Sequence, residues 1–407
     1  MKSRCAFSHR APNGAASQKV VSSDIERLDE ALQSASYSYV SGSTHAFYHY
    51  PARFSPAIAR AVIQTFSEPG DWVLDPFMGG GTAIIEGLQV GRKMLGVDIN
   101  TLAHFVTRVR TTPLSHREER EILTWAAKST GKFTSGEVRG FKWPSVENLP
   151  GSVNVFIAGA LGESEQLRNH RQRLFARCVL LRLGQWALDC RDFAAPRRRR
   201  LGDKLPVLTN EMLGGLREFV GLCRRAGTRR TRIVGNRRLL CRDAVDLHQD
   251  SRVAALLGQP RLVFTSPPYP GVHVLYHRWQ YRGRRETAAP YWIASVQDGH
   301  FESFYLGGSR TPTGQKRYFR MITSAFKSVR ALMNPRGIVV QLVGFANAET
   351  QLPQYLHAMQ QAGFEEWGPF GASVPRLKRR VPNRKWYARL QGDSDASSEL
   401  LLFHRPR

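Results

Sequence analysis

Short apolar runs and amphipathic stretches alternate near the start of the chain. Residues 72–74 and 93–99 are apolar runs of strand length, and helical spacing begins between them at about Thr82. A glycine turn at residues 79–81 separates the first run from that helix. Strand, turn, helix and strand in this order form a βαβ unit, which predicts a parallel sheet.

The same alternation returns in the second half of the chain. Strands are expected at about 238–244, 261–265, 337–345 and 399–404, with helices at about 316–333 and 349–362. Two further helices are expected ahead of the first unit, at 24–33 and from about Pro56. The pattern as a whole predicts an α/β fold.

Residues 115–235 interrupt this alternation and hold no convincing series of strands. Apolar residues spaced three and four apart at 116–129, 164–189 and 210–227 indicate helices there, broken among others by the arginine run 197–200. We therefore predict a partly disordered N-terminal extension at 1–44, a first α/β half at 45–114, a helical insertion at 115–235 and a second α/β half at 236–407.

The composition of the chain indicates a polyanionic partner. The 407 residues are 42% hydrophobic and 10% aromatic, as in folded globular proteins, and 59 Lys and Arg against 33 Asp and Glu give a net charge of +26. Nucleic acid is the commonest partner of such a surplus, although the charges could also be simply solvated. The chain has no apolar run that could span a membrane and no apolar leader, so we expect a cytoplasmic protein. Its five cysteines show no CxxC spacing, which favours reduced thiols over a zinc site.

The glycine turn lies in the stretch DPFMGGGT, residues 75–82. Glycines at the mouth of a helix let the backbone approach a ligand, but neither a following Lys nor a GxGxxG pattern is present. An acid, Asp98, closes the next strand and could accept the two hydroxyls of a ribose. Asp75 could face a cationic tail, so S-adenosyl-L-methionine fits this pocket. The alternative is a turn that serves only strand–helix packing.

A second motif, TSPPY at residues 265–269, ends a strand on two prolines. Ligands of parallel α/β sheets bind at the carboxyl ends of strands, and prolines fix the backbone and prevent a helix from starting there. Ser266 and nearby carbonyl oxygens would then accept hydrogen bonds from an amino group on a planar ring, with Tyr269 stacked on that ring. The alternative is a plain Pro-Pro turn or an exposed proline-rich ligand.

Together these motifs resemble those of the amino-group DNA methyltransferases, which modify cytosine N4 or adenine N6. TSPPY resembles their catalytic motif, DPFMGGGT their cofactor loop, and HYPARFSP (49–56) the segment that closes over the methionine part of the cofactor. The motif order is one of the family's known permutations, and the resemblance covers about 45–112 and 236–407. It implies a Rossmann-like methyltransferase fold with a mostly parallel seven-stranded sheet, S-adenosyl-L-methionine as cofactor, and double-stranded DNA as partner.

The resemblance also implies roles for individual residues. The catalytic set is Thr265, Ser266, Pro267, Pro268 and Tyr269. The cofactor set is Tyr50, Pro51, Ala52, Arg53, Phe54, Asp75, Pro76, Phe77, Gly79, Gly80, Gly81, Thr82, Asp98, Ile99, Asn100, Asp243 and Ala244, the last two in an acidic turn near the adenine. Serine before the prolines resembles the cytosine-N4 group. Adenine-N6 methylation is the nearest alternative, and RNA methylation or non-catalytic DNA binding are more distant ones.

DNA contacts are expected in two further places. The aromatic and basic stretch after TSPPY, with Tyr276, Arg278, Trp279 and Arg282, is a candidate for capturing a flipped base, the alternative being a self-packed lid. Arg379, Arg380 and Arg384 form a basic track suited to phosphates. The helical insertion is a candidate for target recognition and a cognate restriction nuclease is a candidate partner, whereas no metal is expected and the oligomeric state stays open.

Overall fold

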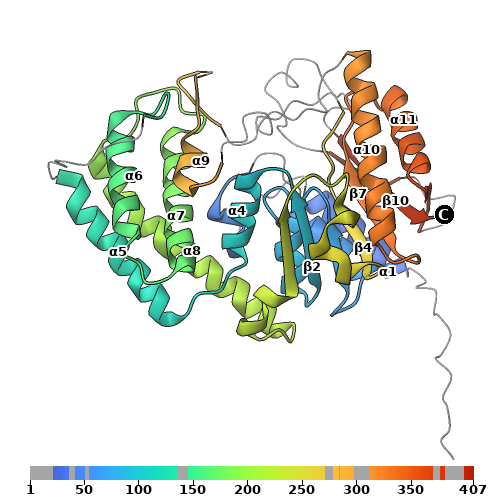
Figure 1. Cartoon of the computed structure of the whole chain (residues 1–407), viewed down its shortest axis with the longest axis horizontal. Coiled ribbons are helices and arrows are strands. Elements are labelled where there is room, and N and C mark those ends of the chain that lie inside the picture. The colour runs from blue at the N-terminus through green and yellow to red at the C-terminus, as the bar shows by residue number, and fades with distance from the viewer. Residues whose placement is uncertain are drawn as a thin grey trace, which may run out of the picture.

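The computed structural model describes residues 22–35, 42–50, 55–135, 145–270, 278–283, 285–297, 311–369, 376–380 and 398–407. Its centre is an eight-stranded sheet in the order β3-β2-β1-β4-β7-β10-β8, with β9 paired to β10 (Figure 1). The strands are β1 Trp72–Asp75, β2 Lys93–Asp98, β3 Arg237–Cys241, β4 Pro260–Thr265, β7 Ile338–Val343, β8 Phe364–Glu366, β9 Lys378–Arg380 and β10 Ser398–Pro406.

The five strands from β3 to β7 run parallel, and β10 enters antiparallel between β7 and β8. The expectation of an α/β fold with a mostly parallel sheet is therefore confirmed. The sheet has one strand more than the seven expected, because the short β9 pairs with one end of β10.

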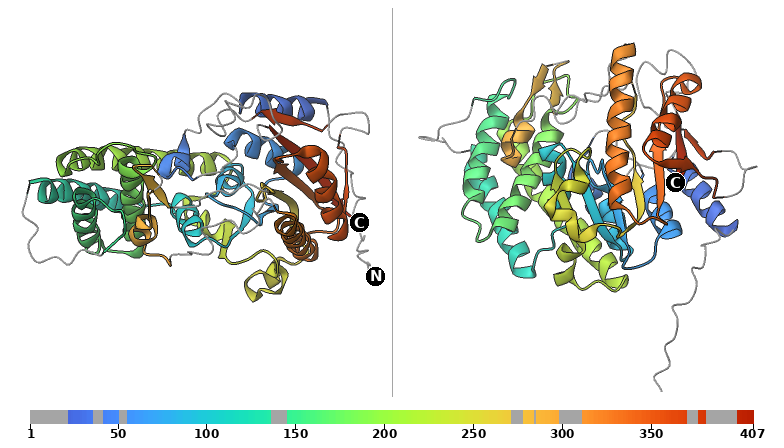
Figure 2. Two further views of the ribbon diagram at one scale, coloured as in Figure 1. Left: turned by 90° about the horizontal axis from the view of Figure 1, so that it is seen from above. Right: turned by 45° about the vertical axis from the view of Figure 1, so that its right-hand side comes forward.

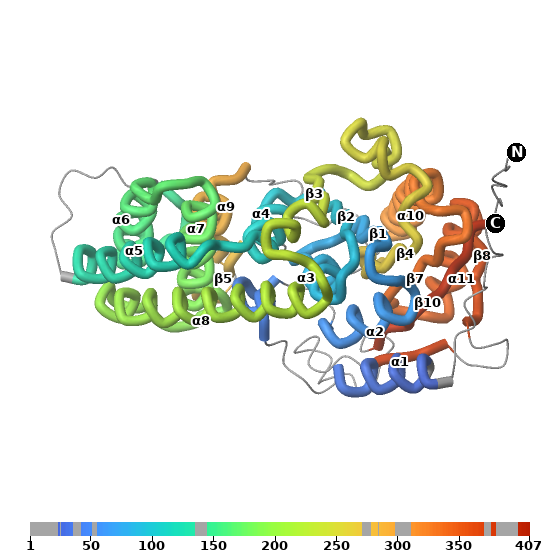
Figure 3. Tube along the Cα trace, turned by 90° about the horizontal axis from the view of Figure 1, so that it is seen from below, coloured from blue at the N-terminus to red at the C-terminus, as the bar shows by residue number. Residues whose placement is uncertain are grey.

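Helices cover both faces of the sheet. The helices α2 Pro56–Phe66, α3 Thr82–Gln89 and α4 Thr101–Arg110 pack on one face, and α10 Pro312–Leu332 and α11 Ala348–Gln361 on the other (Figures 2 and 3). Within one strand the side chains divide between the two cores: Leu262 and Phe264 face the first, and Val263 faces the second. The strands are apolar on both sides because helices cover both faces.

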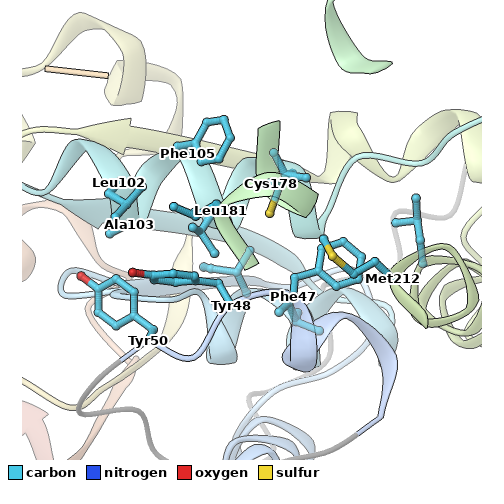
Figure 4. Close-up of a cluster of buried hydrophobic side chains, with 14 of the residues drawn as sticks. Phe47, Tyr48, Tyr50, Leu102, Ala103, Phe105, Cys178, Leu181 and Met212 are labelled. Carbon is cyan, nitrogen blue, oxygen red and sulfur yellow. The ribbon is translucent and has the colours of Figure 1, made fainter. Parts of the chain in front are cut away.

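Helices occupy the described part of the chain between α4 and β3, where we expected a helical insertion. The α-helices there are α5 His116–Ser135, α6 Gly151–Ser164, α7 His170–Leu188 and α8 Arg198–Arg225. Its apolar side chains continue the core on the α2–α4 face, where Phe47 and Tyr48 lie between α4 and the insertion (Figure 4). The short 3₁₀ helix Ser43–Phe47 packs on α8. The insertion thus shares one continuous core with the sheet.

Several elements differ from the sequence-based expectation. The arginine run 197–200, expected to break the chain, lies at the start of α8. The aromatic and basic stretch after TSPPY, where no strand or helix was expected, contains the hairpin β5 Trp279–Tyr281 and β6 Arg285–Thr287, followed by α9 Ala289–Ala294. Helix α6 was not expected, because its apolar residues surround the helix and leave no amphipathic pattern to detect. Among the described helices, none is long and apolar enough to cross a membrane.

Candidate active site

The carboxyl end of β1 holds a carboxylate that is unusually deeply buried. Asp75 is 0% exposed, and its Oδ1 accepts hydrogen bonds from Thr265 Oγ1 at 2.6 Å and from the Phe77 N–H at 3.1 Å. Its Oδ2 is buried and has no hydrogen-bond partner in the described part of the chain. Burial raises the pKa of Asp75 to about 7, and the charge of Asp98 acts in the same direction. A buried acceptor without a partner is what a ligand carrying a donor or positive charge would complete.

In the glycine loop between β1 and α3, Gly80 and Gly81 have no room for a side chain. Gly79 and Gly81 have φ angles of +49° and +79°, a left-handed backbone that glycine adopts without strain. A Cβ on Gly80 would lie 2.8 Å from the Cβ of Tyr50, so the buried Tyr50 side chain packs directly on the loop. This places the start of HYPARFSP beside DPFMGGGT.

The carboxyl end of β2 holds a second acid beside the loop. Asp98 Oδ2 accepts from the Gly79 N–H and Oδ1 from the Asn100 N–H, both at 2.8 Å. Burial raises the pKa of Asp98 to about 6, and these two backbone bonds oppose that shift. Each oxygen retains a lone pair for a further donor, as binding two ribose hydroxyls requires.

The surroundings of Asp98 suit a flat apolar ring. The Ile99 side chain is 41% exposed, which is uncommon for a large apolar group, while Asn100 caps α4 by accepting from two backbone N–H groups. Cys241 on β3 pairs in register with Asp98, so the turn with the exposed Asp243 and the buried Ala244 follows beside it. The Asp243 side chain accepts from the Val245 N–H.

TSPPY, the expected catalytic motif, begins where β4 ends, next to β1 in the sheet. Thr265 does not face outward: its hydroxyl holds Asp75 and so joins TSPPY to the cofactor loop. The hydroxyls of Ser266 and Tyr269 lie 2.9 Å apart, and the Tyr269 O–H donates to Glu399 Oε1 at 2.8 Å. The Pro268 carbonyl accepts from the Tyr318 O–H at 2.8 Å. The motif is therefore held by side chains from α10 and β10.

Two of the expected DNA contacts need correction. Trp279 is 1% exposed; its indole N–H donates to Tyr48 Oη at 3.1 Å, and its ring fills the space over Gly184 of α7. A ring packed there belongs to the core and is not available to a flipped base. Arg379 is 9% exposed and pairs with Glu399 at 3.3 Å, so its charge faces a carboxylate and not the solvent.

The remaining expected contacts divide into two groups. Arg282 is exposed in the turn of the β5–β6 hairpin with its guanidinium 5.5 Å from the Tyr281 ring, and Arg278 is half-buried before β5. Pro51, Ala52, Arg53, Phe54, Tyr276, Arg384 and the side chain of Arg380 lie outside the described residues.

The sequence reasoning missed three cations on α10. Lys316, Arg317 and Arg320 are exposed on the N-terminal half of this helix. Because α10 ends just before β7 begins, its first turns lie at the carboxyl edge of the sheet, and the Tyr318 bond to Pro268 places them near TSPPY. The sequence did contain a sign of them, because they lie at the start of a helix that was already predicted to precede a parallel strand.

The residues present fit S-adenosyl-L-methionine. The partnerless oxygen of Asp75 suits a positive charge, and the free lone pairs of Asp98 suit ribose hydroxyls. The bound cofactor would supply an electrophilic methyl group to the acceptors around Ser266.

Comparisons with known proteins agree with this chemistry over part of the chain. Residues 10–105 match the N6/N4 methyltransferase family model, described as DNA methylase. The type II methyltransferase M.MvaI of Kocuria varians is 36% identical over 74 residues, 17% of this chain and 16% of its own. The DNA adenine methyltransferase YhdJ of Escherichia coli is 30% identical over 86 residues, 21% of this chain and 29% of its own. The match thus spans less than a third of either relative.

Solved structures resemble the chain only weakly. TrmN from Thermus thermophilus has a TM-score of 0.29 at 11% identity and covers 87% of this chain and 49% of its own. The rRNA methyltransferase AviRa from Streptomyces viridochromogenes has a TM-score of 0.32 at 10% identity, covering 88% and 89%. Similarity this low carries no argument about function.

Proposed function

Residues 10–105 belong to the N6/N4 amino-group methyltransferase family, and from this premise we propose that the protein is an S-adenosyl-L-methionine-dependent DNA methyltransferase acting on cytosine N4. One observation carries the proposal. The 2.6 Å hydrogen bond from Thr265 to Asp75 fixes the catalytic motif against the cofactor loop, so an amine held at Ser266 would lie beside a methyl donor held at Asp75.

The proposed roles follow from the contacts of each side chain. Asp98 accepts the ribose hydroxyls, and Asp75 faces the positive end of the cofactor. Ser266 accepts a hydrogen bond from the target amine, which turns the nitrogen lone pair away from the ring and towards the methyl carbon. Tyr269 stacks on the base. No base need remove a proton beforehand, because the amine becomes acidic only as the methyl group arrives.

The target base must leave the duplex, because its amine is otherwise out of reach of a buried cofactor. With Trp279 buried, the exposed cations Lys316, Arg317 and Arg320 of α10 are the best-placed phosphate contacts among the described residues. They would bind the backbone of any sequence and set the salt dependence of binding without selecting a base.

Adenine N6 is the second candidate target, since the relatives include an adenine methyltransferase. Serine before the two prolines favours cytosine N4, because the motif resembles that of the cytosine group. Both reactions place an exocyclic amine against the same acceptors.

Nucleoside analysis of DNA from a host that expresses the protein tests the proposal. We expect N4-methylcytosine with the wild-type chain and none with Ser266→Ala, at equal protein levels and equal cofactor affinity. N6-methyladenine instead would move the proposal to the second target. Absence of both, together with methylation of structured RNA by the purified protein, would refute DNA as the substrate.

A further inference from the structure

A chain of hydrogen bonds runs from the catalytic motif into the protein interior. It begins at Ser266 Oγ, 2.9 Å from Tyr269 Oη, and continues from Tyr269 to Glu399 Oε1 at 2.8 Å. The other carboxylate oxygen of Glu399 lies 3.3 Å from Arg379 Nη1. Arg379 Nη2 donates to the carbonyl of Ala35, just after helix α1 Ser22–Ser34 (Figure 3). Glu399 and Arg379 are both buried, at 7% and 9% exposed.

The direction of these bonds is determined by the number of protons available. A carboxylate facing a guanidinium can only accept, so the single proton of the Tyr269 hydroxyl points to Glu399. The Tyr269 oxygen is then left as the acceptor towards Ser266, and the Ser266 proton must point to Tyr269. Both lone pairs of Ser266 Oγ are therefore turned to other donors.

We propose that Glu399 is a positioning residue of the methyl-transfer site, which acts through Tyr269 to make Ser266 a pure acceptor and to receive the proton that the target amine loses. This rests on the proposed function, because it needs an amine at Ser266. A serine hydroxyl would otherwise be a poor substitute for a carboxylate or amide oxygen, since its own proton could point at the amine and compete for the nitrogen lone pair.

The transfer balances along the same path. The amine nitrogen forms a bond to the methyl carbon, and the electron pair of the broken carbon–sulfur bond stays with sulfur. One proton then leaves the nitrogen for Ser266 Oγ, the Ser266 proton passes to Tyr269 Oη, and the Tyr269 proton passes to Glu399 Oε1. Each hydroxyl ends with one proton, and Glu399 ends protonated. Arg379 keeps the carboxyl group in place and holds its second oxygen away from Tyr269.

Glu399→Gln tests the proposal with little change of shape. The amide oxygen can still accept from Tyr269, but the side chain can no longer take up a proton. Tyr269→Phe removes a different hydroxyl from the series of hydrogen bonds, so the proposal can still be tested if the Glu399 variant fails to fold. The matched control is Glu366→Gln on the neighbouring strand β8, which also removes a carboxylate from an arginine pair, here Arg376 at 2.6 Å, without a link to Ser266.

The readouts are the single-turnover rate with the cofactor preloaded, its solvent deuterium isotope effect, cofactor affinity by calorimetry and the melting temperature. In the wild type we expect this rate to show a solvent isotope effect. In Glu399→Gln and Tyr269→Phe we expect a rate at least ~10-fold lower at neutral pH. Both variants should lose the isotope effect and keep their cofactor affinity. Glu366→Gln should behave as the wild type does.

The outcomes separate this proposal from the proposed function. If the wild type methylates DNA and both variants keep its rate and isotope effect, the relay is refuted and Glu399 is only part of a structural ion pair. If both variants lose rate but keep the wild-type isotope effect, the proton path is refuted. If the wild type methylates no DNA, the proposed function fails, and the relay with it.

Discussion

The carboxyl edge of the sheet and the β5–β6 hairpin both bury polar and aromatic side chains, but they bury them in different ways. At the sheet edge two acids lie beneath the glycine loop, and one oxygen of Asp75 has no hydrogen-bond partner in the described part of the chain. In the hairpin the indole of Trp279 packs on α7 and its N–H is bonded to Tyr48. The first region holds an unsatisfied polar group that destabilises the fold until a ligand binds. In the second region the buried indole N–H has its hydrogen-bond partner, and the packed ring stabilises the fold.

The largest expected effect comes from removing the indole of the hairpin. Trp279→Ala should lower the free energy of unfolding by about 3–5 kcal/mol, because it leaves a cavity between the hairpin and α7. Chemical denaturation measures this, with the half-buried Trp292→Ala as a control of smaller effect. A decrease below about 1 kcal/mol, with damaged methylation of paired DNA, would return Trp279 to the candidates for base capture.

At the sheet edge, removing an acid should affect the ligand more than the fold. Asp98→Ala should weaken binding of S-adenosyl-L-methionine by about 1.5–3 kcal/mol, the usual worth of a hydrogen bond to a charged group. The control is Asp71→Ala at the opposite end of β1, where affinity should not change. Calorimetry that finds equal affinity in folded Asp98→Ala would remove this residue from the cofactor site.

The pH dependence of stability should come from the sheet edge and not from the hairpin. An unfolded aspartate titrates near pH 4, whereas the pKa of Asp75 is about 7, so the folded chain binds more protons between these values. The contribution of Asp75 to the free energy of unfolding is thus fully present below about pH 4. It is lost as pH rises towards 7, by at most about 1.4 kcal/mol per pH unit. Denaturation at several pH values should show this slope in the difference between the wild type and Asp75→Asn. An unchanged slope in Asp75→Asn would contradict the assignment.

The smallest effect is expected on the exposed cations of α10. Replacing Lys316, Arg317 and Arg320 by Gln should reduce the slope of log affinity against log salt by about 0.9 for each phosphate that these side chains no longer neutralise. Base choice and stability should not change. Lys327→Gln, exposed further along the same helix, is the control. A salt slope equal to that of the wild type would place the DNA elsewhere.

These contrasts also explain how far the sequence could predict the structure. The strands that lead into DPFMGGGT and TSPPY were recognisable by their length and apolar pattern. Parallel sheet geometry therefore already placed the two motifs at the same edge of the sheet. Trp279 was a candidate for base capture because of its place after TSPPY and the aromatic and basic composition of that stretch. Composition cannot tell a ring that packs on a helix 95 residues earlier, at Gly184, from one that faces solvent.

The role of Glu399 could not be predicted from the sequence for a similar reason. It lies 130 residues from Tyr269 and begins an ordinary apolar strand with no motif around it. Only the antiparallel entry of β10 beside β7 brings it to the catalytic motif. Likewise α6 was missed because a helix whose apolar residues surround it has no polar face to mark its period.

The place of β10 in the chain also governs when TSPPY can be held in place during synthesis of the protein. Among the described strands it is the last that the ribosome makes, yet it lies inside the sheet, between β7 and β8. At about 5–20 residues per second, the earlier strands have seconds in which to assemble before residues 398–406 emerge. Until then β7 has an open edge, and Tyr269 has no Glu399 to bond. A nascent chain can therefore assemble the loop DPFMGGGT well before TSPPY is held in place by Glu399.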